Sequence, residues 1–216
     1  MKRIEVPPAD ILKELSETYR MSRDLGDVAA VLRQLSEPAA IDQSSWGEAY
    51  GTVSATFRIG YWHDLIGVLY RVTAPELLAR FSRDQETVCR DSCVEIFVSD
   101  TDGEGSYTNY EFNALGTCFA GSGLGRYGRM LLAPERMERI LRAGVTRRAQ
   151  NGLWDWSQLV IIPHGWGESL EGRVLRGNFY TTGDDLCPPV YQSWNRVVTT
   201  KPDFHRPEFF GEIRFL

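Results

Sequence analysis

The stretch Asp91-Ser92-Cys93-Val94-Glu95-Ile96-Phe97-Val98-Ser99 decides the fold class, because it is short, rich in β-branched residues and typical of a strand. Successive side chains of a strand point to opposite faces. Val94, Ile96 and Val98 therefore share one face, which suits a core, while Glu95 shares the other face with Phe97. We expect Glu95 to point outward to solvent, as polar residues do on a half-buried sheet.

Similar segments recur along the chain and predict an all-β fold. They are short, rich in aromatic and β-branched residues, and separated by Gly, Asp, Asn or Pro, at residues 53–59, 66–73, 107–119, 154–162, 173–180 and 212–216. Many short strands without alternating helices favour an antiparallel two-sheet β-sandwich over a parallel α/β sheet. Phe112 and Ile161 should join the buried set.

Helical patterns are confined to three places. Asp10 is a plausible cap for a helix with Ile11, Leu12 and Leu15 on one face, and residues 25–35 show a similar pattern. Pro134 suits the first turn of a helical insertion over residues 134–142. We interpret residues 1–216 as a single domain, with residues 1–40 forming an N-terminal extension that packs on it.

Composition and charge exclude several classes of protein. Apolar residues make up 43% of the chain and the formal net charge is −5, with no basic run, so we expect no nucleic acid as a partner. No apolar stretch approaches a membrane span, so no membrane is expected either. The first residues do not form a signal peptide. Taken as written the protein is expected in the cytoplasm, and a removed leader would make it secreted or periplasmic.

An acidic loop follows the first strand quoted above. Asp100, Asp102, Glu104 and Glu111 fall at positions one, three, five and twelve, with Gly105 at six, which is the ligand spacing of a helix-flanked calcium loop. Strand-like segments flank this loop where such a site needs helices. We therefore expect a hairpin connection without metal or other cofactor, and keep calcium as the weaker alternative. The four cysteines form no metal-site pattern and are expected to be reduced thiols.

Several motifs in order carry a family resemblance. They are DSCVEIF (91–97), YEFNALG (110–116), IIP (161–163), GNFY (177–180), SWN (193–195) and PDFHRPEFFG (202–211). Together they resemble carbohydrate-binding module family 9, especially its stand-alone bacterial branch, over residues 41–216. The resemblance implies an antiparallel β-sandwich that binds sugars without catalysis and often accompanies plant-polysaccharide hydrolases.

The resemblance also implies a site. Modules of this family grip a sugar between two tryptophans and hydrogen-bond it from nearby polar side chains. The first tryptophan position falls at Val88 or Cys89 in this chain, and the second falls near Phe204, with Trp194 the nearest tryptophan. At most half of the aromatic clamp is therefore kept by residue type.

Polar and aromatic candidates follow from the same correspondence. The family's glutamate is Glu95, and its arginine and asparagine pair on the next strand corresponds to Glu111 and Asn113, so that Glu111 is a departure. The expected hydrogen-bonding residues are Glu95, Glu111, Asn113 and His205. The expected stacking residues are Tyr180, Trp194 and Phe204. Glu111 and Asn113 are two apart on one strand and so project to the same side.

The function implied is non-catalytic binding of a mono- or oligosaccharide, linked to degradation of xylan or another plant glycan, with a glycoside hydrolase as partner. One alternative is a glycoside hydrolase that uses Glu95 and Glu111, whose carboxyl groups would lie ~5 Å or ~7–9 Å apart across an open cleft. Another is a haem-binding sandwich, which needs an axial histidine or methionine pair. No such pair stands out among these residues.

Overall fold

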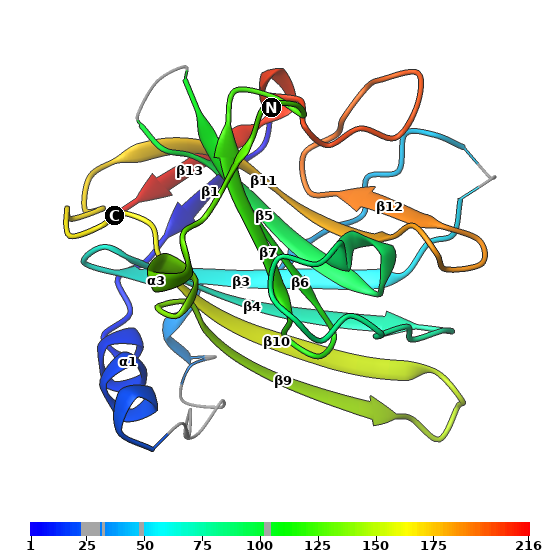
Figure 1. Cartoon of the computed structure of the whole chain (residues 1–216), viewed down its shortest axis with the longest axis horizontal. Coiled ribbons are helices and arrows are strands. Elements are labelled where there is room, and N and C mark those ends of the chain that lie inside the picture. The colour runs from blue at the N-terminus through cyan, green and yellow to red at the C-terminus, as the bar shows by residue number, and fades with distance from the viewer. Residues whose placement is uncertain (23–30, 32, 48–49, 102–104) are drawn as a thin grey trace.

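The protein is a sandwich of two stacked β-sheets in the computed structural model, which describes residues 1–22, 31, 33–47, 50–101 and 105–216 (Figure 1). The eight-stranded sheet has the order β1 (Arg3–Val6), β13 (Gly211–Phe215), β11 (Val174–Gly183), β5 (Cys93–Ser99), β6 (Tyr107–Asn113), β7 (Cys118–Gly123) and β8 (Met130–Leu131), with β12 (Val190–Ser193) paired to β11. The five-stranded sheet has the order β2 (Ala39–Ala40), β3 (Ser54–Trp62), β4 (Leu65–Ala74), β10 (Trp154–Pro163) and β9 (Leu141–Arg148).

Strand pairing confirms the predicted sandwich and adds details that the pattern did not reveal. Neighbouring strands are antiparallel except for β1, which pairs with β13 in parallel and makes residues 3–6 part of a sheet. The predicted strand over residues 107–119 is two strands, β6 and β7, joined by a turn in which Gly116 has a φ of +82°. Positive φ is easily reached only without a Cβ.

The helices are shorter than the sequence patterns indicate. α1 (Ile11–Ser22) matches the first prediction, whereas α3 (Pro134–Met137) covers only the start of the predicted insertion because Leu141 begins β9. The predicted helix over residues 25–35 lies mainly outside the described residues. Two 3-10 turns, η1 (Val88–Arg90) and η2 (Pro207–Phe209), complete the described elements. Within the described residues, no helix is long and apolar enough to cross a membrane.

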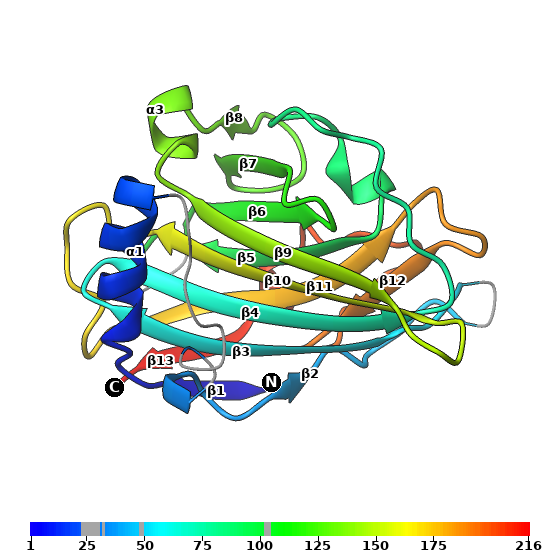
Figure 2. The same cartoon turned by 90° about the horizontal axis from the view of Figure 1, so that it is seen from below.

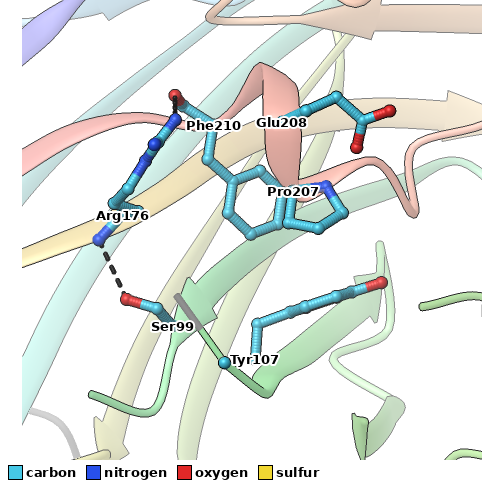
Figure 3. Close-up of a pocket in the computed structure, with 7 residues that line it drawn as sticks. Ser99, Tyr107, Arg176, Pro207, Glu208 and Phe210 are labelled. Atoms are coloured by element: carbon cyan, nitrogen blue, oxygen red, sulfur yellow. Dashed lines mark hydrogen bonds between the residues drawn. The ribbon is translucent and has the colours of Figure 1, made fainter. Parts of the chain in front are cut away.

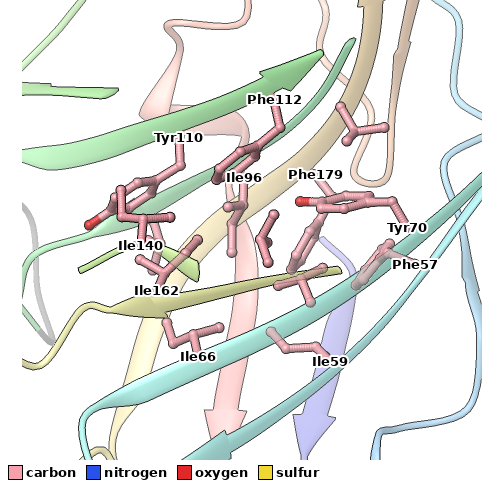
Figure 4. Close-up of a cluster of buried hydrophobic side chains, with 14 of the residues drawn as sticks. Phe57, Ile59, Ile66, Tyr70, Ile96, Tyr110, Phe112, Ile140, Ile162 and Phe179 are labelled. Carbon is pink, nitrogen blue, oxygen red and sulfur yellow. The ribbon is translucent and has the colours of Figure 1, made fainter. Parts of the chain in front are cut away.

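The main core lies between the two sheets and contains the face predicted for β5. Val94, Ile96 and Val98 are buried there with Phe112, facing side chains such as Phe57 from the other sheet (Figure 4). Ile161 is also buried, but on the outer face of the five-stranded sheet, in a second cluster with residues of α1. All five residues expected in the core are therefore buried.

α1 covers one end of the five-stranded sheet, as Figure 2 shows, and glycines on the sheet permit its close approach. Gly60 and Gly67 are cross-strand partners on β3 and β4. A Cβ on Gly67 would lie 2.4 Å from Leu12 Cδ2, closer than real Cβ contacts occur. Leu12 thus fills space that any other residue at position 67 would occupy.

Trp194 belongs to the core between the sheets, where only 3% of its surface is exposed. Its ring packs edge-on against Phe57 at 6.0 Å and Phe179 at 5.7 Å between ring centroids. A Cβ on Gly211 would lie 2.4 Å from Trp194 Cζ3, so the indole also rests directly on the β13 backbone.

We predict that Trp194→Ala lowers the free energy of unfolding by about 3–5 kcal/mol, because it empties a large, closely packed site. Val198→Ala is the control, since Val198 is 59% exposed and such surface changes stay within about 0.5 kcal/mol. Denaturant unfolding of both variants measures the difference. Equal midpoints for the two variants would contradict the core assignment.

Candidate functional site

The outer face of the eight-stranded sheet brings two carboxyl groups side by side. Tyr180, Glu95 and Glu111 are consecutive cross-strand partners on β11, β5 and β6. Their side chains share the face opposite Val94 and Ile96 because side chains alternate along each strand. Directly paired residues have Cβ atoms about 4.5–5.5 Å apart, so the two acids interact strongly.

Glu95 is buried, which corrects the expectation that it points to solvent. Only 2% of Glu95 and 6% of Glu111 is exposed. The reason is a third apolar cluster on this face, in which Phe204 and Phe210 from the C-terminal segment cover the sheet. The two faces predicted for β5 are correct. A strand pattern, however, carries no information about a distant segment that covers the polar face.

Each carboxyl group accepts one hydrogen bond from a neighbouring side chain. Thr182 Oγ1 donates to Glu95 Oε1 at 2.7 Å, and Asn109 Nδ2 donates to Glu111 Oε1 at 2.8 Å. Arg129 Nε donates to Asn109 Oδ1 at 3.0 Å, which fixes the orientation of that amide. Thr182 and Asn109 thus position the two acids.

Burial and mutual repulsion keep protons on this pair. The pKa of Glu95 is raised well above its usual value, first by burial and then by the neighbouring Glu111. Burial also raises the pKa of Glu111, although the Asn109 hydrogen bond and the Arg129 charge oppose that shift. Because two adjacent carboxylates in a dry site cannot both ionise easily, the pair holds a proton to higher pH than an isolated carboxyl group does.

The two acids line a cavity of about 130 Å³, called the carboxylate cavity below. Phe204 forms part of its wall and stacks on Tyr180, with ring centroids 4.0 Å apart. The full lining is Cys89, Glu95, Phe97, Glu111, Arg126, Thr182, Asp184, Tyr191, Pro202, Asp203, Phe204 and His205. The resemblance places the first clamp tryptophan at Val88 or Cys89, of which Cys89 lies on the cavity wall, and Phe204, near the second clamp position, also lies on that wall.

His205 contributes a neutral imidazole to the same wall. Burial together with Arg129 and Arg126 lowers its pKa to about 4. Its Nδ1 lies 2.9 Å from the Tyr107 hydroxyl. Near neutral pH this side chain therefore adds hydrogen-bonding capacity without charge.

Three predicted site residues do not reach the cavity. Asn113 is buried and its amide is committed to Phe81 O at 2.8 Å and Asp91 Oδ2 at 3.0 Å. Trp194 lies in the core on the other side of the sheet. Tyr180 is fully buried beneath Phe204. Four predicted residues therefore line the cavity together: Glu95, Glu111, Phe204 and His205. Tyr180 supports Phe204 from below, whereas Asn113 and Trp194 stabilise the fold away from the cavity.

Pattern reasoning missed several cavity residues. Arg126 lies in the glycine-rich loop after β7, Asp184 follows β11, and Tyr191 lies on β12. Thr182 had a usable signal, because it is two residues beyond Tyr180 on the same strand and shares its face. The other three come from loops or from a strand that no pattern predicted.

A larger cavity of about 280 Å³ lies near the hairpin end of β5 and β6 (Figure 3). Arg176 crosses its wall and donates from Nη2 to Phe210 O at 2.9 Å. Tyr107 and Phe210 line it, yet each is only 1% exposed and so presents almost no ring face. Although this cavity is larger than the carboxylate cavity, it offers a sugar almost no aromatic surface for stacking.

The acidic loop is a hairpin connection, because it joins the adjacent antiparallel strands β5 and β6, whose first paired residues beside the loop are Ser99 and Tyr107. Asp100 accepts hydrogen bonds from the hydroxyls of Thr108 at 2.7 Å and Ser122 at 3.1 Å. The candidates Asp102 and Glu104 lie outside the described residues. No group of three or more metal-ligating side chains occurs among the residues that are described. All four cysteines are free thiols.

The geometry bears on the two alternative functions. Glu95 and Glu111 lie next to each other on the cavity floor, whereas a hydrolase pair faces a sugar from opposite sides of an open cleft. His205 is the one histidine among the described cavity residues, and no methionine lines the cavity with it. This lining does not supply the axial pair that a haem needs.

Comparisons with known proteins agree on one family. A profile of carbohydrate-binding family 9 matches residues 28–215. A candidate carbohydrate-binding protein from Bacteroides uniformis is similar in structure, with a TM-score of 0.79, 25% identity, and coverage of 100% of this chain and 99% of that one. No curated protein matches the chain.

Two further structures share the fold. A family 9 carbohydrate-binding module from Caldicellulosiruptor kristjanssonii in complex with glucose has a TM-score of 0.60 and 16% identity, covering 100% of this chain and 96% of that one. The cellotriose complex of a module from the same organism has a TM-score of 0.60 and 14% identity, covering 99% and 93%. With the profile match over most of its length, this chain belongs to carbohydrate-binding family 9 and is a non-catalytic carbohydrate-binding protein.

Proposed function

We propose that the protein binds mono- or oligosaccharides in the carboxylate cavity and serves polysaccharide degradation, with xylan or another plant glycan as the source and a glycoside hydrolase as partner. The observation that carries the proposal is the buried pair of Glu95 and Glu111 on the floor of a cavity whose wall includes Phe204. Glucose and cellotriose in the two Caldicellulosiruptor complexes support the sugar class.

The pair suits hydroxyl recognition. Glu95 and Glu111 each accept one protein hydrogen bond on Oε1, and no hydrogen bond from the described residues reaches either Oε2. A sugar hydroxyl can donate to these oxygens, and Phe204 at the wall gives apolar contact for sugar C–H groups. Because the cavity is small, the proposal places a chain end there, with the rest of the chain outside.

Burying two acids without a cation beside them is expensive for a fold. Sites of this kind are retained where they serve binding or catalysis, so perturbed acids in a cavity support a functional role. The other face of the same strands is mainly apolar, with Val94, Ile96 and Phe112 in the core and Thr108 as a buried polar exception on β6. The acids thus lie on the polar outer face of a sheet whose other face forms the core.

We predict that Glu95→Ala weakens binding of cello- or xylo-oligosaccharides by about 3- to 10-fold, since one buried hydrogen bond contributes about 0.5–1.5 kcal/mol. Glu171→Ala is the control, because Glu171 is exposed and lies outside the cavity. Calorimetric titration of wild type and both variants measures the effect. If wild type binds and Glu95→Ala binds equally well, the site lies elsewhere.

A second prediction concerns stability. The pKa of Glu111 rises from 4.5 to about 7 on folding, so the folded protein holds more protons between these values. The free energy of unfolding therefore falls as pH rises through this window, by up to about 3 kcal/mol from this group. Glu111→Gln should flatten that fall and stabilise the fold near pH 8. Denaturant unfolding at about pH 5 and about pH 8 tests this, and an unchanged pH dependence in Glu111→Gln would refute it.

A further inference from the structure

The carboxylate cavity holds more acid than the protein neutralises. Glu95, Glu111, Asp184 and Asp203 line it, and the one basic side chain of its lining, Arg126, pairs with Asp203 at 3.3 Å. Among the described residues, Glu95, Glu111 and Asp184 have no ion-pair partner. Three carboxyl groups therefore line one cavity without an ion pair, and two of them, Glu95 and Glu111, are buried while Asp184 is exposed.

The nearest other cation is committed elsewhere. Arg129 donates to Asn109 Oδ1 from Nε at 3.0 Å and to the backbone oxygens of Gly125 and Gly121 at 2.8 and 2.6 Å. Its guanidinium carbon also lies 4.5 Å from the centre of the Tyr107 ring. Arg129 thus reaches Glu111 through Asn109 and does not contact the acid itself.

Free acceptor atoms give a second and independent indication. Glu95 is 2% exposed, lines the cavity, and receives no hydrogen bond on Oε2 from the described residues. Glu111 has the same arrangement on β6, where Asn109 donates to Oε1 alone. Asp184 is exposed at the cavity edge; Cys89 Sγ is a weak donor 3.8 Å from its Oδ2, and a hydrogen bond with Tyr191 opposes the rise of its pKa caused by burial. Buried acids with free acceptors, here Glu95 and Glu111, are satisfied best by a donor that is positively charged.

We propose that the preferred ligand of this cavity is an amino sugar, a saccharide that carries a protonated primary amine. The ammonium group lies between Glu95 and Glu111 and faces Asp184, while the sugar ring contacts Phe204. An ammonium has three donors and no acceptor, which matches a floor of carboxyl oxygens. The inference rests on the proposed function. It differs from that proposal in one respect: the saccharide that binds most tightly carries an amine and is not a neutral plant glycan.

Proton linkage follows from this chemistry. The ammonium favours the ionised form of the pair, so binding releases protons near neutral pH, whereas a neutral sugar releases few. The charged and titratable groups around Glu111 are Glu95, Asp184, Asp203, Tyr191, Cys89, Cys93, Cys118, Arg126, Arg129 and His205. The carboxyl groups are the members of this set whose protonation an ammonium changes most, since His205 is already neutral and the pKa of Cys89 is raised by burial.

The test is calorimetric titration of the full chain with glucosamine, glucose and N-acetylglucosamine at about pH 6.5 in buffers of different ionisation enthalpy. We expect glucosamine to bind about tenfold more tightly than glucose, as one added charge-assisted hydrogen bond implies. N-acetylglucosamine keeps the ring but lacks the charge and should gain nothing over glucose. Proton release should accompany glucosamine alone.

Two variants and a control assign the effect to the cavity. Glu111→Gln keeps the shape and a hydrogen-bonding group and should reduce the preference for glucosamine over glucose about tenfold. Glu95→Gln tests the partner acid in the same way. Glu171→Gln changes an exposed carboxyl group outside the cavity and should leave the preference unchanged.

Each other outcome overturns a defined part of the argument. Equal binding of glucosamine and glucose would refute the amino-sugar preference and leave the proposed function standing. Binding of none of the three sugars would remove both. If 2-aminoethanol binds as tightly as glucosamine, the sugar ring contributes nothing and the saccharide part is wrong. A glucosamine preference that persists in both Gln variants would place the amine elsewhere.

Discussion

The register of three strands is the constraint on which the site depends. Tyr180, Glu95 and Glu111 are direct partners across β11, β5 and β6, so the two acids must be neighbours whatever their side chains prefer. A shift by one residue on β5 or β6 would move an acid into the apolar core, and the hydrophobic alternation therefore fixes the register. The same residues that form the core thus hold two acidic side chains together.

The C-terminal segment turns this pair from a surface feature into a cavity. Phe204 stacks on Tyr180 and also contacts Trp46, at 5.7 Å between ring centroids, which anchors the segment over the sheet. Its burial of the outer face dehydrates Glu95 and Glu111 and raises the pKa of both. The apolar cluster that packs on the outer face is therefore also the cause of the raised pKa values in the site.

Local patterns predicted the fold well because the sandwich is encoded by alternation over short distances. Val94, Ile96 and Phe112 are buried as their strand positions indicate. The strand of residues 107–119 was predicted as one segment, because a tight turn at Gly116 leaves no break in the apolar pattern. The short edge strands β1 and β12 have too few residues for a period to be visible.

Two kinds of signal predicted part of the candidate site: strand patterns for Glu95 and Glu111, and the family resemblance for Phe204 and His205 in the C-terminal segment. Glu95 and Glu111 follow from alternation and hairpin pairing, whereas Arg126, Asp184 and Asp203 come from loops whose positions depend on the whole chain. Trp194 shows the limit of reasoning by residue type. It is the tryptophan nearest in sequence to the expected clamp position, but it follows β12 directly and donates its backbone amide to Phe179 O at 2.8 Å.

A reduced aromatic clamp, as the family resemblance implies, and an acidic cavity floor both affect how a ligand exchanges water contacts for protein contacts. A tryptophan near the position of Cys89 would cover part of the wall, whereas the small thiol there leaves Asp184 within 3.8 Å and open to the cavity. With less apolar stacking surface, affinity must come from polar contacts. Polar contacts contribute most when they carry charge and are shielded from water. Here the shielding comes from the C-terminal segment, and the charge comes from acids that have no cation beside them. Selectivity then rests on the charge of the ligand more than on the shape of its ring.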